Sequence, residues 1–203
     1  MLDSMYIWDT IGSDYLISRG ILPEPNLNEI FKKMSIVQAA EYYQKVYGLT
    51  DNVEGIVDGV NNMIEHLYAN VVKLKPGIPE LLCKMHGKCI KMCVATATDR
   101  YMVEAALKSN GIDKYFCGIL TCTEVASGKD SPEIFEKALK LLGTSKEDTL
   151  IFEDALHAIE TAKNAGFKVA GVYDKSSDNE TDKIKELCDE YITAYKEWSD
   201  KRL

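Results

Sequence analysis

The sequence has few of the residues that build the common metal and redox sites. Its 203 residues include only three histidines, and none of its six cysteines belongs to a C-x-x-C pair. Zinc-binding and dithiol redox sites need such spacings, so neither is expected. Most of the cysteines sit among apolar residues, which is typical of reduced, partly buried thiols in a cytosolic protein.

Long apolar runs and an excess of positive charge are also missing. No stretch approaches the roughly 18 apolar residues of a membrane-spanning helix, and the start of the chain shows no signal-peptide pattern. The 24 lysines and arginines against 32 aspartates and glutamates give a formal net charge of -8. We therefore expect a cytoplasmic protein with neither a nucleic acid nor a membrane as partner. A local pocket for phosphate is compatible with this balance.

Three signatures of other α/β enzyme classes are absent. The sequence contains no G-x-G-x-x-G, no G-x-x-x-x-G-K-[ST] and no G-x-S-x-G. Dinucleotide-binding, P-loop and serine-hydrolase roles are therefore disfavoured.

What the sequence does contain is two regions with different periodicity. Apolar residues at helical spacing predict four helices in residues 5–75, which we interpret as a helical domain distinct from the rest of the chain. Residues 76–203 alternate helices with short apolar runs at 90–95, 118–120, 149–152 and 168–172, and Ser131 with Pro132 is expected to start one of the helices. This alternation predicts an α/β fold with a parallel sheet covered by helices on both faces. Residues 1–4 precede the helical domain.

Polar side chains follow three of these predicted strands. Thr96, Lys129 and the pair Glu153-Asp154 come after successive strands, where open parallel sheets bind ligands. Each signal alone has a simple alternative, because threonine and acidic residues cap helices and a loop lysine is usually a solvated charge. Two adjacent carboxylates ending a buried strand are the more specific signal, since hard oxygen ligands suit Mg²⁺.

Taken together and in this order, the residues resemble the haloacid dehalogenase (HAD) superfamily, in its phosphatase and β-phosphoglucomutase-like branch. The stretches that carry the resemblance are Val94-Ala95-Thr96, Gly128-Lys129-Asp130-Ser131-Pro132, and Ile151-Phe152-Glu153-Asp154 followed by Ala162-x-x-Ala165-Gly166. The resemblance implies a three-layer, Rossmann-like core with an inserted helical cap. It also implies a Mg²⁺-dependent hydrolase of small phosphorylated metabolites, with a phosphomutase as a close variant.

The resemblance assigns a role to each candidate. Thr96 would bind the transferring phosphoryl group, and Lys129 would stabilise the charge of the nucleophile and the phosphate. Asp154 would hold Mg²⁺ with help from Glu153. A metal-free dehalogenase is less expected, because Glu153-Asp154 suggests a metal.

The family's first motif, D-x-D-G-T followed by L-x-D-S, has only its end in this sequence. Leu2-Asp3-Ser4 matches that end, and no D-x-D pair occurs in the 203 residues. We therefore expect the central first strand and both catalytic aspartates to be missing, and the chain as given to show little turnover. The missing motif is explained either by a sequence that starts too late or by a naturally degenerate relative. If the position of the first strand in the sheet is open, its unpaired neighbours would favour self-association.

Two functions remain open. The first is a HAD hydrolase by lineage, and the second is a non-catalytic protein that binds a small anion through the same residues. The substrate would depend on the inserted domain, where sugar phosphates, phosphoglycolate and nucleotide monophosphates are all candidates. Residues of this domain that could face the substrate are Tyr6, Trp8, Asp9, Tyr15, Lys32, Lys33 and Gln38. Tyr42 and Tyr43 are expected to pack, and His157 is expected either at the surface or behind the residues that contact the ligand.

Overall fold

The computed structural model describes residues 1–31 and 34–203, and the chain divides into two compact units. Unit 1 comprises Met1 together with 74–203, and unit 2 comprises 2–73. Lys32 and Lys33, two of the substrate-facing candidates, lie outside the described residues. None of the helices in the described part is long and apolar enough to cross a membrane.

Unit 2 is helical, as its periodicity predicts. Its described elements are β1 (Leu2–Asp3), α1 (Met5–Ser18), α2 (Leu27–Phe31), α3 (Ile36–Tyr47) and α4 (Val53–Asn70), and β2 (Lys73–Leu74) leads out of it. Helix α3 begins with a capping box, in which the Ser35 hydroxyl accepts from the Gln38 amide and the Gln38 side chain accepts from the Ser35 amide. Strands β1 and β2 pair with each other, so the two chain segments that enter and leave the helices run side by side.

Unit 1 alternates helices and strands. The elements are α5 (Ile78–Gly87), β3 (Val94–Thr96), α6 (Arg100–Ser109), η1 (Asp113–Tyr115), β4 (Ile119–Thr121), α7 (Cys122–Val125), α8 (Glu133–Leu142), β5 (Leu150–Glu153), α9 (Leu156–Asn164), β6 (Lys168–Val172), η2 (Lys175–Glu180), α10 (Thr181–Leu187), β7 (Glu190–Ile192) and α11 (Tyr195–Arg202). The sequence pattern had no signal for β7. Helix α8 starts one residue later than expected, because Pro132 and not Ser131 occupies its N-cap.

The strands are parallel and fall into two hydrogen-bonded groups. β3 pairs with β4 so that Val94 lies opposite Ile119 and Thr96 opposite Thr121. β6 pairs with β5 on one side and with β7 on the other. In the described part of the chain, no backbone ladder joins the β3–β4 group to the β5–β6–β7 group.

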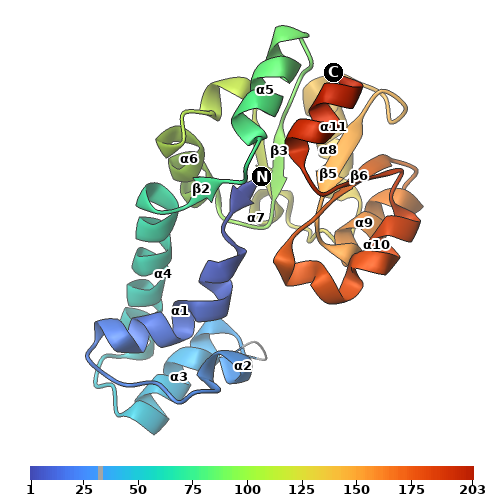
Figure 1. Ribbon diagram of the computed structural model, residues 1–203. Coiled ribbons are helices and arrows are strands. Elements are labelled where there is room, and N and C mark those ends of the chain that lie inside the picture. The colour runs from blue at the N-terminus through green and yellow to red at the C-terminus, as the bar shows by residue number, and fades with distance from the viewer. Residues whose placement is uncertain (32–33) are drawn as a thin grey trace. The chain divides into compact units, whose positions relative to one another are not determined.

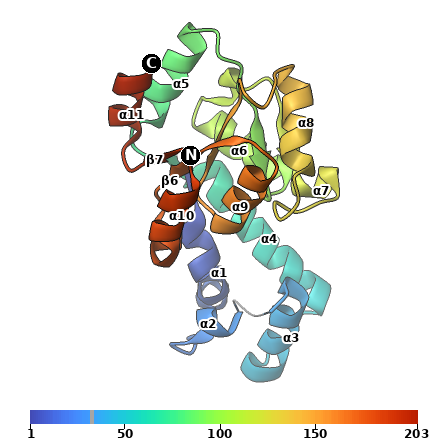
Figure 2. The ribbon, with the colours of Figure 1, turned by 90° about the vertical axis from the view of Figure 1, so that its right-hand side faces the viewer.

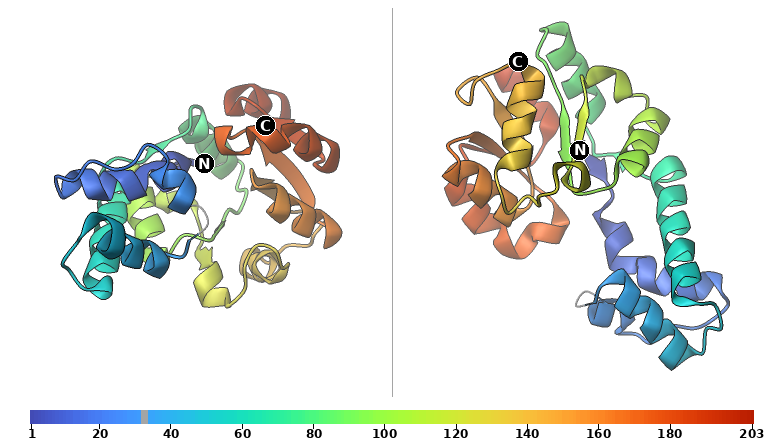
Figure 3. Two further views of the ribbon diagram at one scale, coloured as in Figure 1. Left: turned by 90° about the horizontal axis from the view of Figure 1, so that it is seen from below. Right: turned by 180° about the vertical axis from the view of Figure 1, so that it is seen from behind.

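Helices cover both faces of the strands, which gives the three layers expected. One apolar cluster joins α5, α6 and the start of α11 to β6 and to Val94, Leu150 and Phe152. The other joins α8, α9 and α10 to Val169 of β6 and to Ala95 and Ile151. Helices α5 and α11 lie side by side in Figures 1 and 2, and α8 runs along β3 and β4 in the view from behind in Figure 3. Because β3 and β5 alternate between the same two clusters, they belong to one layer.

Candidate active site

The charged candidates meet at the end of β5. The Lys129 ammonium lies 2.7 Å from Oε2 of Glu153, and only 17% and 6% of the two side chains are exposed. The other carboxylate oxygen of Glu153 accepts from the backbone amides of Asp154 at 3.1 Å and Ala155 at 3.2 Å. Both oxygens of Glu153 are therefore occupied by protein donors.

These contacts decide the protonation of Glu153. Burial alone would raise the pKa of the carboxyl group, but the charge and hydrogen bond of Lys129 and the Ala155 amide outweigh it, so the pKa is lowered. Glu153 is ionised at neutral pH, and Lys129 is held in place opposite it.

The pKa of Asp154 is shifted in the opposite direction. Its side chain is half-buried. Burial and the adjacent negative charge of Glu153 raise its pKa, while the positive charge of Lys75 opposes the rise. A carboxylate whose charge is only partly compensated in this way is suited to receive a cation.

Thr96 ends β3, and its hydroxyl accepts from the Thr98 amide at 3.1 Å. It lies opposite Thr121, and the next residue, Cys122, is close enough to feel the charges of Lys129 and Glu153. Burial raises the pKa of the Cys122 thiol, and the Lys129 charge partly offsets this rise. The ends of β3, β4 and β5 therefore meet in one region, and Thr96 faces the turn that opens α6.

A second ion pair of this region had no signal in the sequence. Lys75 pairs with Asp174, which follows β6, and the two side chains are 13% and 7% exposed. Burial opposes ionisation of Asp174, but hydrogen bonds from Lys75 and Ser176 prevail and lower its pKa. Asp154 and Asp174 both act on Tyr195, whose pKa is raised chiefly by burial.

The donor set can be tested against the magnesium ion that the family resemblance implies. Asp154 offers hard carboxylate oxygens, whereas the oxygens of Glu153 are occupied. Residues 1–31 and 34–203 contain no cluster of three or more acidic, histidine or cysteine side chains that could hold a metal. Mg²⁺ is commonly bound by one or two carboxylates together with water and substrate phosphate. The side chains present fit that mode with Asp154 as the protein ligand.

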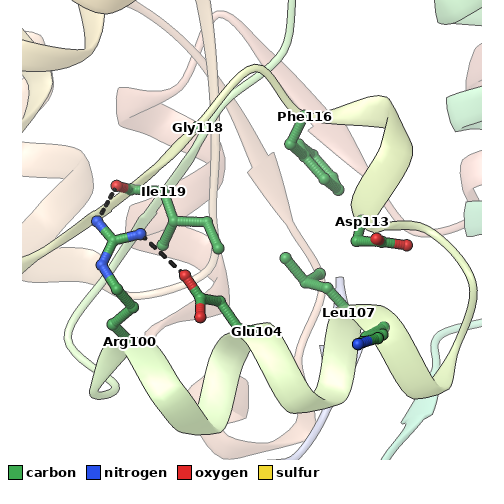
Figure 4. Close-up of a pocket in the computed structure, with 8 residues that line it drawn as sticks. Arg100, Glu104, Leu107, Asp113, Phe116, Gly118 and Ile119 are labelled. Atoms are coloured by element: carbon green, nitrogen blue, oxygen red, sulfur yellow. Dashed lines mark hydrogen bonds and ion pairs between the residues drawn. The ribbon is translucent and has the colours of Figure 1, made fainter.

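A pocket of about 350 Å³ lies away from these residues. It is formed by α6, η1 and β4, with Leu107, Phe116 and Ile119 among its lining side chains (Figure 4). Arg100 spans one side, donating to the Ile119 carbonyl at 2.7 Å and to Glu104 at 3.1 Å. Thr96, Lys129, Glu153 and Asp154 do not line this pocket, so we place the candidate site at the strand ends.

The substrate-facing candidates in unit 2 differ in how much of their side chains is exposed. Tyr6 and Trp8 are exposed on α1, at 43% and 47%. The expectation that Tyr15 faces the substrate is wrong, because Tyr15 is buried among the helices and packs against Tyr43 with ring centroids 5.5 Å apart and the rings tilted by 47°. Gln38 is engaged in the capping box of α3.

Tyr42 and Tyr43 are expected to pack and His157 to stay out of contact with the ligand, and the structure agrees with the packing and with the surface position. Tyr43 packs and donates to the Gly12 carbonyl, Tyr42 packs edge-on against Phe31, and His157 is exposed.

Comparison with known proteins gives the family. The family model described as haloacid dehalogenase-like hydrolase matches residues 17–172. A phosphorylated carbohydrates phosphatase of Thermotoga maritima is 29% identical over 64% of this chain, and the match spans 61% of that enzyme. The pyrophosphatase PpaX of Halalkalibacterium halodurans is 31% identical over 72% of this chain and 77% of its own length.

Solved structures agree on the fold. A Thermotoga maritima protein assigned as a β-phosphoglucomutase superposes with a TM-score of 0.86 at 21% identity, covering 100% of this chain and 95% of its own. CbbY from Rhodobacter sphaeroides, solved in complex with xylulose-1,5-bisphosphate, superposes with a TM-score of 0.73 at 19% identity over 97% of this chain and 91% of its own. The chain belongs to the haloacid dehalogenase-like hydrolases, and the relatives that it resembles in sequence are phosphatases.

Proposed function

We propose that the site at the ends of β3 and β5 binds the phosphate group of a small phosphorylated metabolite, as a Mg²⁺-dependent phosphatase of this family would. The observation that carries the proposal is the buried pair of Lys129 and Glu153 directly beside Asp154. Relatives described as phosphatases of carbohydrates and pyrophosphate support a small phosphate ester or anhydride as substrate.

Each residue has a chemical task in this proposal. Glu153 keeps Lys129 protonated and in place, so that its ammonium neutralises negative charge on the phosphoryl oxygens. The Thr96 hydroxyl would donate a hydrogen bond to the same group, because a hydroxyl whose oxygen accepts from the Thr98 amide still carries a proton to donate. Asp154 would hold Mg²⁺, which supplies charge neutralisation on the phosphoryl group.

The reaction also needs a nucleophile, and the 203 residues contain no D-x-D pair to supply one. Positioning and charge stabilisation act on a bound phosphate but do not replace the attacking group. We therefore propose that this chain, as it stands, binds phosphate esters with little turnover. The non-catalytic alternative, a protein that binds a small anion through the same residues, is favoured by the same observation.

Activity separates the two functions. Hydrolysis of para-nitrophenyl phosphate with Mg²⁺ is measured for this chain and for a form extended through any in-frame codons upstream of Met1. Activity in the extended form alone supports the hydrolase and the roles given to Thr96, Lys129 and Asp154. If neither form hydrolyses the ester although the extended chain is folded, the result supports the protein that binds a small anion without catalysis. Activity of the short form would contradict the proposed lack of turnover, and Asp3 would then be the first residue to replace.

A further inference from the structure

Two buried lysine–carboxylate pairs lie at the ends of neighbouring strands. β5 and β6 pair in parallel, so the residues that follow the two strands meet at the same edge of the sheet. Glu153 ends β5 and holds Lys129, whereas Asp174 follows β6 and holds Lys75. The charge of Lys75 also acts on Asp154, where it opposes the rise in pKa that burial causes. The second pair therefore belongs to the same charged region as the first.

The two lysines differ in how many hydrogen-bond donors remain for a ligand. An ammonium group has three N–H donors. Among the residues that the structure describes, Lys129 uses one of them, in its bond to Glu153. Lys75 uses two, one for the Asp174 carboxylate and one for the Tyr173 carbonyl at 3.3 Å. Lys129 can therefore donate to a phosphate group, whereas Lys75 is almost fully engaged.

Asp174 is itself held in an orientation that faces Lys75. One of its oxygens accepts from the Ser176 amide at 2.9 Å and from the Ser176 hydroxyl at 2.6 Å, while the other oxygen accepts from Lys75. A buried ion pair separates only at a high cost, because the charge left behind has no counter-charge. A ligand is therefore not expected to draw Lys75 away from Asp174.

The side-chain charges at these two strand ends have a negative sum. The two lysines face three carboxylates, which belong to Glu153, Asp154 and Asp174. The amino group of Met1 lies in the same region, but burial and the charge of Lys75 lower its pKa to about 6, so it is mostly uncharged at pH 8. A second anionic group beside a bound phosphate would therefore meet carboxylates, and like charges placed together in a site repel.

We propose that Asp174 determines specificity by withholding Lys75 from the ligand. The site then accepts the phosphate group of an ester whose organic part is uncharged, as in a sugar monophosphate. It disfavours small molecules with a second anionic group, such as phosphorylated carboxylic acids and bisphosphates. This inference rests on the proposed function, because it concerns the same phosphate site. Asp174 acts through Lys75, so it is a positioning residue and does not contact the ligand.

Two ligands that differ in one group test this specificity. Hydroxyethyl phosphate and phosphoglycolate are similar in length, and only phosphoglycolate carries a carboxylate. Titration calorimetry at pH 8 with Mg²⁺ should show that the unmodified chain binds hydroxyethyl phosphate about tenfold more tightly or better. Asp174→Asn leaves the charge of Lys75 without its counter-charge, so the affinity for phosphoglycolate should rise about tenfold while that for hydroxyethyl phosphate changes less than about threefold. The control Asp200→Asn, which releases the exposed Lys84, should change neither affinity.

Inorganic phosphate, which has no second group, separates this inference from the proposed function. The specificity role of Asp174 is overturned, and the phosphate site stands, if inorganic phosphate binds but the unmodified chain does not distinguish the two ligands. The same holds if Asp174→Asn keeps the preference of the unmodified chain. If the unmodified chain binds none of the three compounds, the proposed function and this inference are both overturned.

The double variant Lys75→Met/Asp174→Asn gives the decisive measurement if Asp174→Asn does not fold, because it leaves no lone buried charge. Lys75 takes no part in ligand binding under this proposal, so the double variant should bind both ligands within about threefold of the unmodified chain. A larger loss of affinity for either ligand would show that Lys75 contacts the ligand, and the proposal would be refuted.

Discussion

The ammonium of Lys129 lies 2.7 Å from Oε2 of Glu153, and this pair is almost removed from solvent. The same glutamate also accepts from two backbone amides. A buried carboxylate with this many donors fixes its partner lysine firmly, so the pair sets the geometry of the candidate site, and removing one partner alone leaves a buried charge.

Replacing Lys129 by methionine should cost about 3–5 kcal/mol of unfolding free energy at pH 8, because a buried carboxylate is left without its counter-charge. In the native protein the pKa of Glu153 is lowered, so its contribution to stability is present above the unfolded pKa and lost as the pH falls through the folded one. In Lys129→Met we expect burial to raise that pKa, so stability should instead fall as the pH rises. Urea unfolding of both proteins at pH 5 and pH 8 measures the loss at pH 8 and shows whether the stability of Lys129→Met falls as the pH rises.

Two further variants serve as controls for this prediction. Lys84→Met removes an exposed pair and should cost less than about 1 kcal/mol at either pH. Lys129→Met/Glu153→Gln should recover most of the loss at pH 8, because no lone charge remains. Equal losses in Lys129→Met at the two pH values would show that Glu153 is not the group responsible.

The sequence singles out Lys129, Glu153 and Asp154 as site candidates and contains no signal for the neighbouring pair of Lys75 and Asp174. Glu153, Asp154 and Lys129 were found because each follows a strand and because adjacent carboxylates at such a place are unusual. Lys75 and Asp174 are 99 positions apart, one before a proline and the other in a polar loop, so nothing local links them. Contacts between residues so far apart in the sequence depend on the order of the strands in the sheet. The periodicity of apolar residues does not predict that order.

The unpredicted strand β7 and the wrong expectation for Tyr15 have similar causes. β7 is three residues long and begins with a glutamate, and its place beside β6 supplies what its pattern does not. Tyr15 has the amphipathic character of a ligand-facing residue, and only the packing of α1 against α4 shows that it is buried. Short strands and aromatic side chains are therefore decided by tertiary neighbours.

Replacing Thr96 by valine should weaken binding of inorganic phosphate about tenfold or more, since a hydrogen bond to a charged group contributes about 1.5–3 kcal/mol. Thr96→Ser keeps the hydroxyl and should bind nearly as the unmodified chain does. Thr144→Val, which removes the Thr144–Thr149 contact away from the site, is the matched control. Titration calorimetry with phosphate gives the comparison, and equal affinity of Thr96→Val and Thr144→Val would remove Thr96 from the site.

Asp154→Asn should separate stability from metal binding. The raised pKa of Asp154 means that its ionised form destabilises the fold, so stability is lost as the pH rises through the folded pKa. The amide removes this effect, and we expect a gain of about 1 kcal/mol at pH 8 without metal and almost none at pH 3. Thermal unfolding with and without Mg²⁺ should show that the ion stabilises the unmodified chain and not the variant. A variant stabilised by Mg²⁺ as strongly as the unmodified chain would place the metal elsewhere.

Gly77→Ala tests the packing of α5 on α11. Gly77 has a φ of 86°, which side-chain-bearing residues rarely adopt, and an added Cβ would meet the Lys196 nitrogen at 3.1 Å and Tyr195 Cβ at 3.2 Å. We expect a loss of about 1–3 kcal/mol in urea unfolding. Gly87→Ala is the matched control at the other end of the same helix, where nothing lies within 4 Å, and helix propensity predicts a gain of up to about 1 kcal/mol. If both substitutions were neutral, the start of α5 would not be packed on α11 in solution as closely as the approach of Gly77 to Lys196 indicates.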